Sequence, residues 1–176
     1  LLNQPDLSNV GNFLSAFDTL FAKTEKLLAQ PIMSFISVEQ DSLQNKSYSM
    51  QKNLYDQYPT VWNNLYSEIV NAELNVRNIK AKNDYYLFIT YYAGSYFGIK
   101  QSLEIDTIIK CIHAQDKAFQ HALFTCLFFA MKETVFSKDG HMAQPLNLEK
   151  NQSRLFLQRE KNIYELFIKK FKEYST

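Results

Sequence analysis

The feature that most constrains the fold of this chain is its scarcity of backbone breakers, because 176 residues contain only four glycines and four prolines. An all-β protein needs many tight turns, and tight turns rely on these two residue types. Apolar residues recur instead at helical spacing along most of the sequence. The sequence therefore predicts an all-α protein, an irregular helical bundle that forms a single domain over residues 1–176.

Helical periodicity locates the expected elements, which span residues 6–28, 59–80, 83–92, 99–112, 115–136 and 150–174. The segment 83–92 is rich in β-branched and aromatic residues, so a strand is the alternative there; we favour a helix that ends at Gly94. Residues 34–52 are polar and weakly patterned, which indicates a long loop with one helical turn. The helix at 115–136 is apolar on nearly all faces, so we expect it at the centre of the bundle.

Two helix starts and one apolar face are specified more closely. Ser8 or Asp6 is expected to cap the first helix, and Pro59 is expected to open the second. The buried face of the first helix is predicted to consist of Val10, Phe13, Leu14, Phe17, Leu20, Phe21 and Leu27.

Composition excludes several broad classes of protein. With 46% hydrophobic residues, 14 Phe and 11 Tyr, the chain can bury a proper core. Lys and Arg number 19 against 18 for Asp and Glu, so binding to nucleic acid would need a local basic patch. Cys111 and Cys126 lie in apolar patterns without metal spacing, which is typical of reduced, buried thiols in a cytoplasmic protein. No apolar run reaches the ~18 residues of a membrane span.

Three of the four glycines fall in two short stretches, each beside a strongly apolar helix. Gly94 and Gly98 enclose an aromatic turn, and Gly140 precedes His141 in a loop that ends at Pro145. Loops of special shape on a rigid scaffold often carry functional residues. The alternative is an ordinary connection between helices with a glycine at the helix end.

The two stretches resemble a known family. "YYAGSYFGIKQSLEIDTI" followed by "VFSKDGHMAQPLNLEKN" is similar to adenine-specific DNA methyltransferases of restriction-modification systems. The match covers Ala93-Gly94-Ser95-Tyr96-Phe97, the polar residues Gln101, Glu104 and Asp106, and the run from Gly140 to Pro145, with Met142 where Phe is commoner. It spans roughly residues 85–165, and no motif marks residues 1–80.

The catalytic parts of that family are missing from this sequence. Its members bind S-adenosylmethionine with a Phe-x-Gly-x-Gly turn and hold the target adenine with an Asp/Asn-Pro-Pro-Tyr/Phe motif, and neither motif occurs here. The matched segment lies between these motifs, where target recognition is generally placed. The resemblance therefore implies an excised helical middle segment that is inactive alone, and we expect the chain, which begins with Leu, to be a fragment of a larger enzyme.

The implied partners are double-stranded DNA and the remainder of the methyltransferase, which would supply the cofactor S-adenosylmethionine. The residues expected to contact DNA or to support the site are Tyr92, Gly94, Tyr96, Phe97, Lys100, Gly140, His141, Gln144, Arg154 and Arg159. A Gln amide matches the edge of adenine, and a His donates to phosphates or bases. For each residue alone, the alternatives are core packing for the aromatics and solvation for the loop and basic side chains.

A different class of function, a helical protein-interaction module without any role in nucleic-acid binding, also fits the near-neutral charge and apolar helices. A free-standing enzyme is not supported, because the chain has neither a catalytic triad order nor a phosphate loop. His113 and His121 have no carboxylate partner at ligand spacing, which argues against a metal site.

Overall fold

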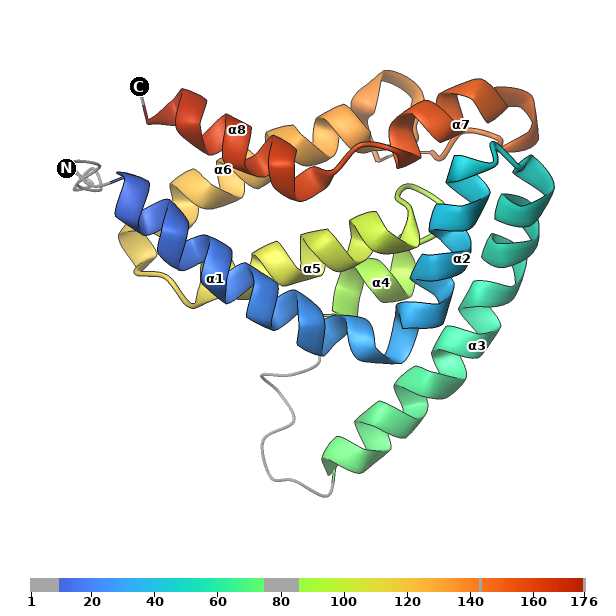
Figure 1. The fold of residues 1–176 in the computed structure, drawn as a ribbon, viewed down its shortest axis with the longest axis horizontal. Coiled ribbons are helices and arrows are strands. Elements are labelled where there is room, and N and C mark those ends of the chain that lie inside the picture. The colour runs from blue at the N-terminus through green and yellow to red at the C-terminus, as the bar shows by residue number, and fades with distance from the viewer. Residues whose placement is uncertain (1–9, 75–85, 143, 176) are drawn as a thin grey trace.

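The computed structural model describes residues 10–74, 86–142 and 144–175, and over these ranges its regular structure is helical (Figure 1). The only sheet-like pairings within them are two isolated bridges, Ala93 with Phe97 and Ser137 with Pro145. The predicted all-α class is confirmed. The elements are α1 (Val10–Ala29), the 3-10 turn η1 (Gln30–Ile32), α2 (Met33–Gln44), α3 (Tyr48–Leu74), α4 (Leu87–Tyr91), α5 (Ile99–His113), α6 (Lys117–Thr134), η3 (Lys138–Gly140), η4 (Glu149–Asn151), α7 (Gln152–Arg159) and α8 (Ile163–Tyr174).

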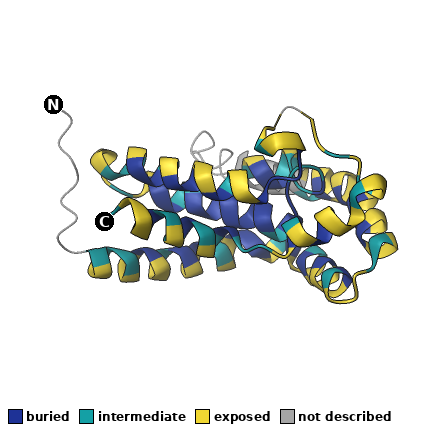
Figure 2. Cartoon of the chain, turned by 90° about the horizontal axis from the view of Figure 1, so that it is seen from above, coloured by how far each residue is buried: buried dark blue, intermediate teal, exposed yellow. Residues whose placement is uncertain are grey.

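Helix α5 is the element that the others surround. Every residue from Gln101 to Ile108 is buried, and α5 packs against α1, α2, α4, α6 and α8. Ile105 and Ile108 belong to a core shared with α1, α6 and α8, whereas Ile99 and Leu103 belong to a second core shared with α2, α3 and α4. Buried residues accordingly line the inner sides of the helices and exposed residues their outer sides (Figure 2).

The helix predicted over 115–136 forms as α6, but one of its faces is open to solvent. Ala122, Leu123 and Ala130 are buried, whereas Phe128 is 63% and Phe129 47% exposed. The central position expected for this helix is therefore occupied by α5. The sequence did not reveal the burial of α5, because acidic residues such as those it contains usually face solvent.

Three predictions for the N-terminal half are wrong. Residues 34–52 form most of α2 and the start of α3 rather than a long loop, because their polar side chains cover the outer faces of helices packed on each other. Pro59 does not open a helix but lies inside α3, which curves along its length (Figure 1). On α1, Leu28 is buried and the predicted Leu27 is 56% exposed. Ser8 and Asp6 lie outside the described residues.

Two predicted boundaries further along the chain also differ. The helix expected over 83–92 is the short α4, which ends at Tyr91 rather than Gly94. The single helix expected over 150–174 is divided into α7 and α8, and the break between them begins at Glu160. Asn162 caps α8, with its Oδ1 accepting a hydrogen bond from the amide N–H of Glu165 at 2.8 Å.

Both cysteines are buried and free, as predicted. Burial raises the pKa of each thiol to about 11. None of the helices in the described part of the chain combines the length and apolarity needed to cross a bilayer.

Candidate functional site

The two glycine-containing stretches, far apart in sequence, lie together in the fold. We call residues 92–98 the first bend and residues 135–146 the second bend. The amide N–H of Phe136 in the second bend donates to the carbonyl of Tyr96 in the first, with an N–O distance of 2.8 Å. The second bend closes on itself, because the N–H of Leu146 donates to the carbonyl of Phe136 at 3.2 Å. The bends are therefore one hydrogen-bonded unit.

The first bend needs a glycine at its corner. Gly94 has a φ of +78°, a region that L side chains rarely adopt. A Cβ there would also lie 3.1 Å from the ring of Tyr55. The Gly94 N–H donates to the carbonyl of Phe97 at 2.8 Å, which tightens the turn.

The aromatic residues of the first bend are mostly packing residues. Phe97 is fully buried and meets the ring of Phe88 with centroids 5.8 Å apart. Tyr92 and Tyr96 are half-buried and pack edge to face at 5.9 Å. Of these predicted site residues, the two tyrosines keep part of their surface in contact with solvent.

A buried carboxylate that the sequence analysis missed anchors the exit of the first bend. Glu39 on α2 is 2% exposed. Its Oε1 accepts from the Ile99 N–H at 2.8 Å and its Oε2 from the Lys100 N–H at 2.9 Å, so Glu39 caps the start of α5. The hydroxyl of Tyr55 donates to the same Oε1 at 2.6 Å. One signal was available: residue 98, directly before the predicted helix, is a glycine and has no side chain to cap that helix.

Arg159 fixes the first bend through hydrogen bonds to its backbone carbonyls. The side chain is 4% exposed, and its Nη1 and Nη2 each donate at 2.9 Å, to the carbonyls of Tyr96 and Ser95 respectively. The guanidinium also lies over the rings of Tyr55 and Phe136. Arg159, predicted to contact DNA or support the site, is enclosed and binds the backbone of the first bend.

Arg154 is exposed and its Nη2 donates to the Ser137 carbonyl at 2.8 Å, which ties the second bend to α7. The two predicted arginines thus each bind one bend through backbone carbonyls. Neither contact was visible in the sequence, because each joins segments far apart in the chain.

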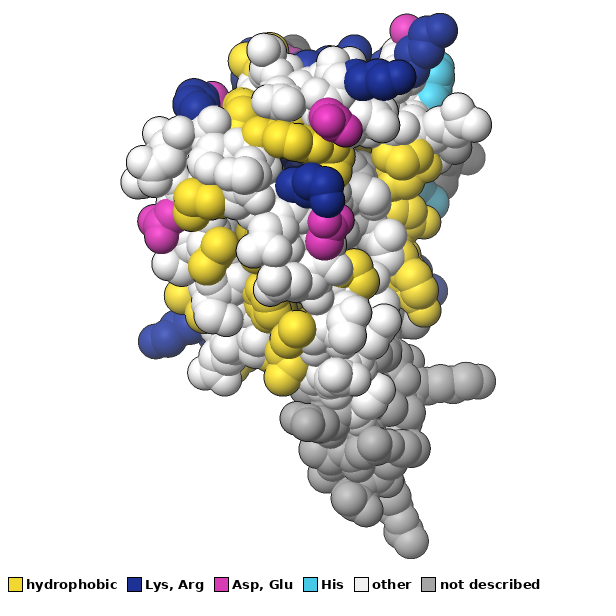
Figure 3. Space-filling view, turned by 90° about the vertical axis from the view of Figure 1, so that its right-hand side faces the viewer, with side chains coloured by type: hydrophobic (Ala, Val, Ile, Leu, Met, Phe, Trp, Pro, Cys, Tyr) yellow, Lys and Arg dark blue, Asp and Glu magenta, His cyan; other side chains and the backbone are white. Residues whose placement is uncertain are grey.

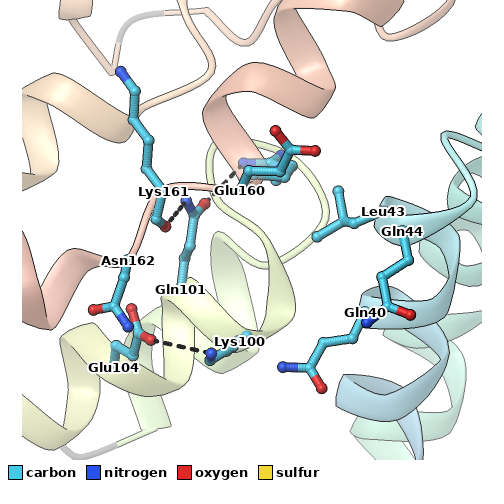
Figure 4. Close-up of a pocket in the computed structure, with 10 residues that line it drawn as sticks. Gln40, Leu43, Gln44, Lys100, Gln101, Glu104, Glu160, Lys161 and Asn162 are labelled. Atoms are coloured by element: carbon cyan, nitrogen blue, oxygen red, sulfur yellow. Dashed lines mark hydrogen bonds and ion pairs between the residues drawn. The ribbon is translucent and has the colours of Figure 1, made fainter.

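The polar residues of α5 that match the family motif bind other helices. Gln101 accepts from the Gly98 N–H at 3.0 Å and donates to the carbonyls of Gln158 and Lys161 at 2.7 and 2.9 Å. Glu104 accepts from the Ile163 N–H at 2.8 Å at the start of α8. These residues line a cavity of about 280 Å³ between α2, α5 and the α7–α8 break (Figure 4).

Asp106, at the opposite side of α5, accepts from the N–H groups of Phe88 and Ile89 at 3.1 and 2.9 Å and caps α4. Burial raises the pKa of Glu104 to about 7 and that of Asp106 to about 8, against the opposing effect of these backbone donors. Both carboxyl groups join α5 to the start of another helix, Asp106 to α4 and Glu104 to α8.

The second bend carries the exposed polar groups. Asp139 and Gly140 have φ angles of +59° and +73°, and this left-handed pair turns the chain outward. Lys138, His141 and Gln144 are all exposed, in agreement with a loop that presents side chains to solvent.

A cavity of about 180 Å³ separates the second bend from α6. Its inner surface is formed by the buried Phe97 and Val135. Phe128, Met131 and Lys132 of α6 form one wall, and Gly140, His141 and Met142 form the other. Of these lining residues, Phe97, Gly140 and His141 were predicted as site residues from the sequence, whereas the wall contributed by α6 was not.

The surface charge is mixed rather than uniformly basic. Basic and acidic side chains alternate on the end of the molecule that Figure 3 shows. On α8, Lys170 pairs with Glu133 at 2.7 Å, and the predicted site residue Lys100 lies 3.9 Å from Glu104. Lys132 and Lys138 form no ion pair with any described residue, so the free positive charge of this region lies around the second bend.

Within residues 10–74, 86–142 and 144–175, no group of three or more His, Cys, Asp or Glu side chains is arranged to hold a metal ion. The sequence contains no glycine turn of the kind that binds S-adenosylmethionine, so no residue is assigned to that cofactor. No protein-family model, curated protein or solved structure matches this chain.

Proposed function

We propose that this chain contacts double-stranded DNA as the target-recognition segment of an adenine-specific DNA methyltransferase, whose remaining domains supply S-adenosylmethionine and the catalytic motif. The observation that carries the proposal is the hydrogen bond between Phe136 and Tyr96. It joins the two stretches on which the family resemblance rests.

The difference between the two bends, one fixed by buried side chains and the other exposed to solvent, supports this function. The first bend is fixed from the inside by Arg159 and by the buried ring of Phe97. The second bend is supported by the first and exposes Lys138, His141 and Gln144. A rigid base beneath a polar loop suits recognition, because little conformational entropy is lost when the loop binds.

Binding of a labelled duplex, followed by fluorescence anisotropy over a range of salt concentrations, tests the proposal. Each Lys–phosphate contact adds close to one unit to the slope of log K against log salt. We expect Lys132→Ala and Lys138→Ala each to reduce that slope by about one unit. Lys117→Ala, at the opposite end of α6 from Lys132, is the matched control and should leave the slope unchanged.

A helical protein-interaction module is the second candidate, and the exposure of Tyr91 (72%), Phe128 (63%) and Leu157 (60%) favours it. Exposed aromatic and aliphatic side chains are common in protein interfaces. Absence of duplex binding, or an affinity that does not change with salt, would reject the DNA proposal in favour of this module.

A further inference from the structure

We infer that the cavity between α6 and the second bend receives a single unstacked nucleobase, whose neighbouring phosphates contact Lys132 and Lys138. This inference rests on the proposed function and adds to it a class of ligand and a place for it.

The lining of the cavity suits a flat aromatic ring. Phe97 and Val135 give it an apolar inner surface. Phe128, Met131, Lys132 and Val135 follow each other at helical spacing, so they form one stripe along α6 and its C-terminal end. An aromatic face and thioether groups are favourable neighbours for a heteroaromatic ring.

The size of the cavity limits the ligand. Its volume is about 180 Å³, below the roughly 300–1,000 Å³ of pockets that hold whole drug-sized ligands. There is room for a ring system, while a sugar and phosphate would remain outside. A base extruded from a duplex has this shape, because its backbone stays at the mouth of the pocket.

The exposure of Phe128 is the second argument. A phenyl ring that is 63% exposed, on a helix whose other face is fully packed, contributes little to the stability of this chain. A base stacked on such a ring contributes about 1–3 kcal/mol to binding. Tyr174 of α8, which is 55% exposed and lines a different groove, offers a control at an exposed aromatic side chain outside the cavity.

The charges at the mouth favour a nucleotide over an aromatic side chain of a partner protein. Lys132, Lys138 and Arg154 lie on or beside the second bend, whereas Asp139 is the only carboxylate of that bend. A Cβ placed on Gly140 would lie 3.2 Å from Cγ of Lys132, which brings this lysine against the mouth. Excess positive charge beside an apolar slot complements a base attached to phosphates.

The four methionines provide a direct test by NMR of ¹³C-methyl-labelled protein. Met131 and Met142 line the cavity, whereas Met33 and Met50 lie on α2 and α3. The probes are a short duplex with a mismatched central adenine and the same duplex with an abasic position there. We expect upfield ring-current shifts of the Met131 and Met142 methyls with the mismatched duplex alone, and none at Met33 or Met50.

Variants at the aromatic wall sharpen the result. Phe128→Ala should abolish the shifts and weaken the binding of the mismatched duplex roughly tenfold, with no change for the abasic duplex. Tyr174→Ala should behave as the parent chain does. Because both side chains are exposed, neither change should affect folding.

Three outcomes overturn the inference. Salt-dependent duplex binding with equal shifts for both probes, or with none, refutes the base site and leaves the proposed function standing. No duplex binding at all refutes both. Shifts of Met131 and Met142 with N-acetyl-tyrosinamide, but not with the mismatched duplex, assign the cavity to a protein partner.

Discussion

At the scale of the residue, Gly98 leaves room for a carboxylate. Its φ and ψ of −68° and 167° are open to any residue. A Cβ at this position would lie 2.8 Å from Oε1 of Glu39 and 3.1 Å from Cδ of Arg159. The missing side chain therefore lets Glu39 reach the first amides of α5.

Gly98→Ala should displace that carboxylate and lower the free energy of unfolding by about 1–3 kcal/mol, the cost of leaving buried polar groups unsatisfied. Urea denaturation followed by circular dichroism measures the change. Gly11→Ala is the control: among the described residues, no atom outside the neighbouring backbone of α1 lies within 4 Å of the added Cβ, so this helical position should gain up to about 1 kcal/mol. An unchanged midpoint in the Gly98 variant would argue against a tight fit.

At the scale of the element, helix starts are capped in two different ways. The starts of α4, α5 and α8 receive buried carboxylates from Asp106, Glu39 and Glu104, which lie at distant sequence positions. Helix α8 is also capped locally by Asn162. The local cap is legible in the sequence, since Asn162 is followed three residues later by Glu165.

Asn162→Ala removes the local acceptor and should destabilise the protein by about 1 kcal/mol. Asn64→Ala, at an exposed position inside α3, is a control that should be neutral or slightly stabilising, because Ala has the higher helix propensity. Thermal and urea denaturation of both variants would decide; equal stabilities of the two would show that Asn162 does not act as a cap.

The same distinction explains how much of the fold the sequence could predict. The helices α1, α5 and α6 were found, because their apolar residues repeat at helical spacing. The helix α2 was missed, because its buried Glu39 and Ser42 look like loop residues until their partners are known. Pro59 was misleading because a curved helix tolerates proline in its interior.

For the candidate site, the sequence located both bends through their glycines but not the contacts that join them. Gly94 and Gly140 do adopt the left-handed conformation that their residue type suggests. The binding of Arg159 to the first bend could not be predicted. In sequence, an arginine bound to carbonyls of another segment looks the same as one on a solvated helix face. Phe128 could not be recognised as a candidate site residue, because it lies in an apolar run of the kind that usually packs into a core.

At the scale of the whole molecule, α5 holds two carboxyls in the interior of the protein. The pKa values of Glu104 and Asp106, about 7 and about 8, exceed their ordinary values because of burial. Between the ordinary pKa values of these groups in the unfolded chain and their raised values in the native state, the native state binds more protons than the unfolded chain. Their contribution to stability is complete at acid pH and is lost as the pH rises through about 7 to 8.

We therefore expect the free energy of unfolding to fall between about pH 5 and about pH 9. Urea denaturation at a series of pH values measures this dependence. A double variant, Glu104→Gln with Asp106→Asn, should be less stable than the parent at acid pH but show a flatter profile. Identical profiles for the two proteins would mean that other groups cause the dependence.

The two hydrogen bonds that Arg159 donates to the first bend reach back 63 and 64 residues along the chain. A shortened version ending before residue 159 would retain both bends in its sequence and lose the side chain that fixes the first of them. Anyone wishing to graft these bends onto a different scaffold would have to carry the C-terminal helices with them, since the portable unit is defined by that arginine rather than by the loops.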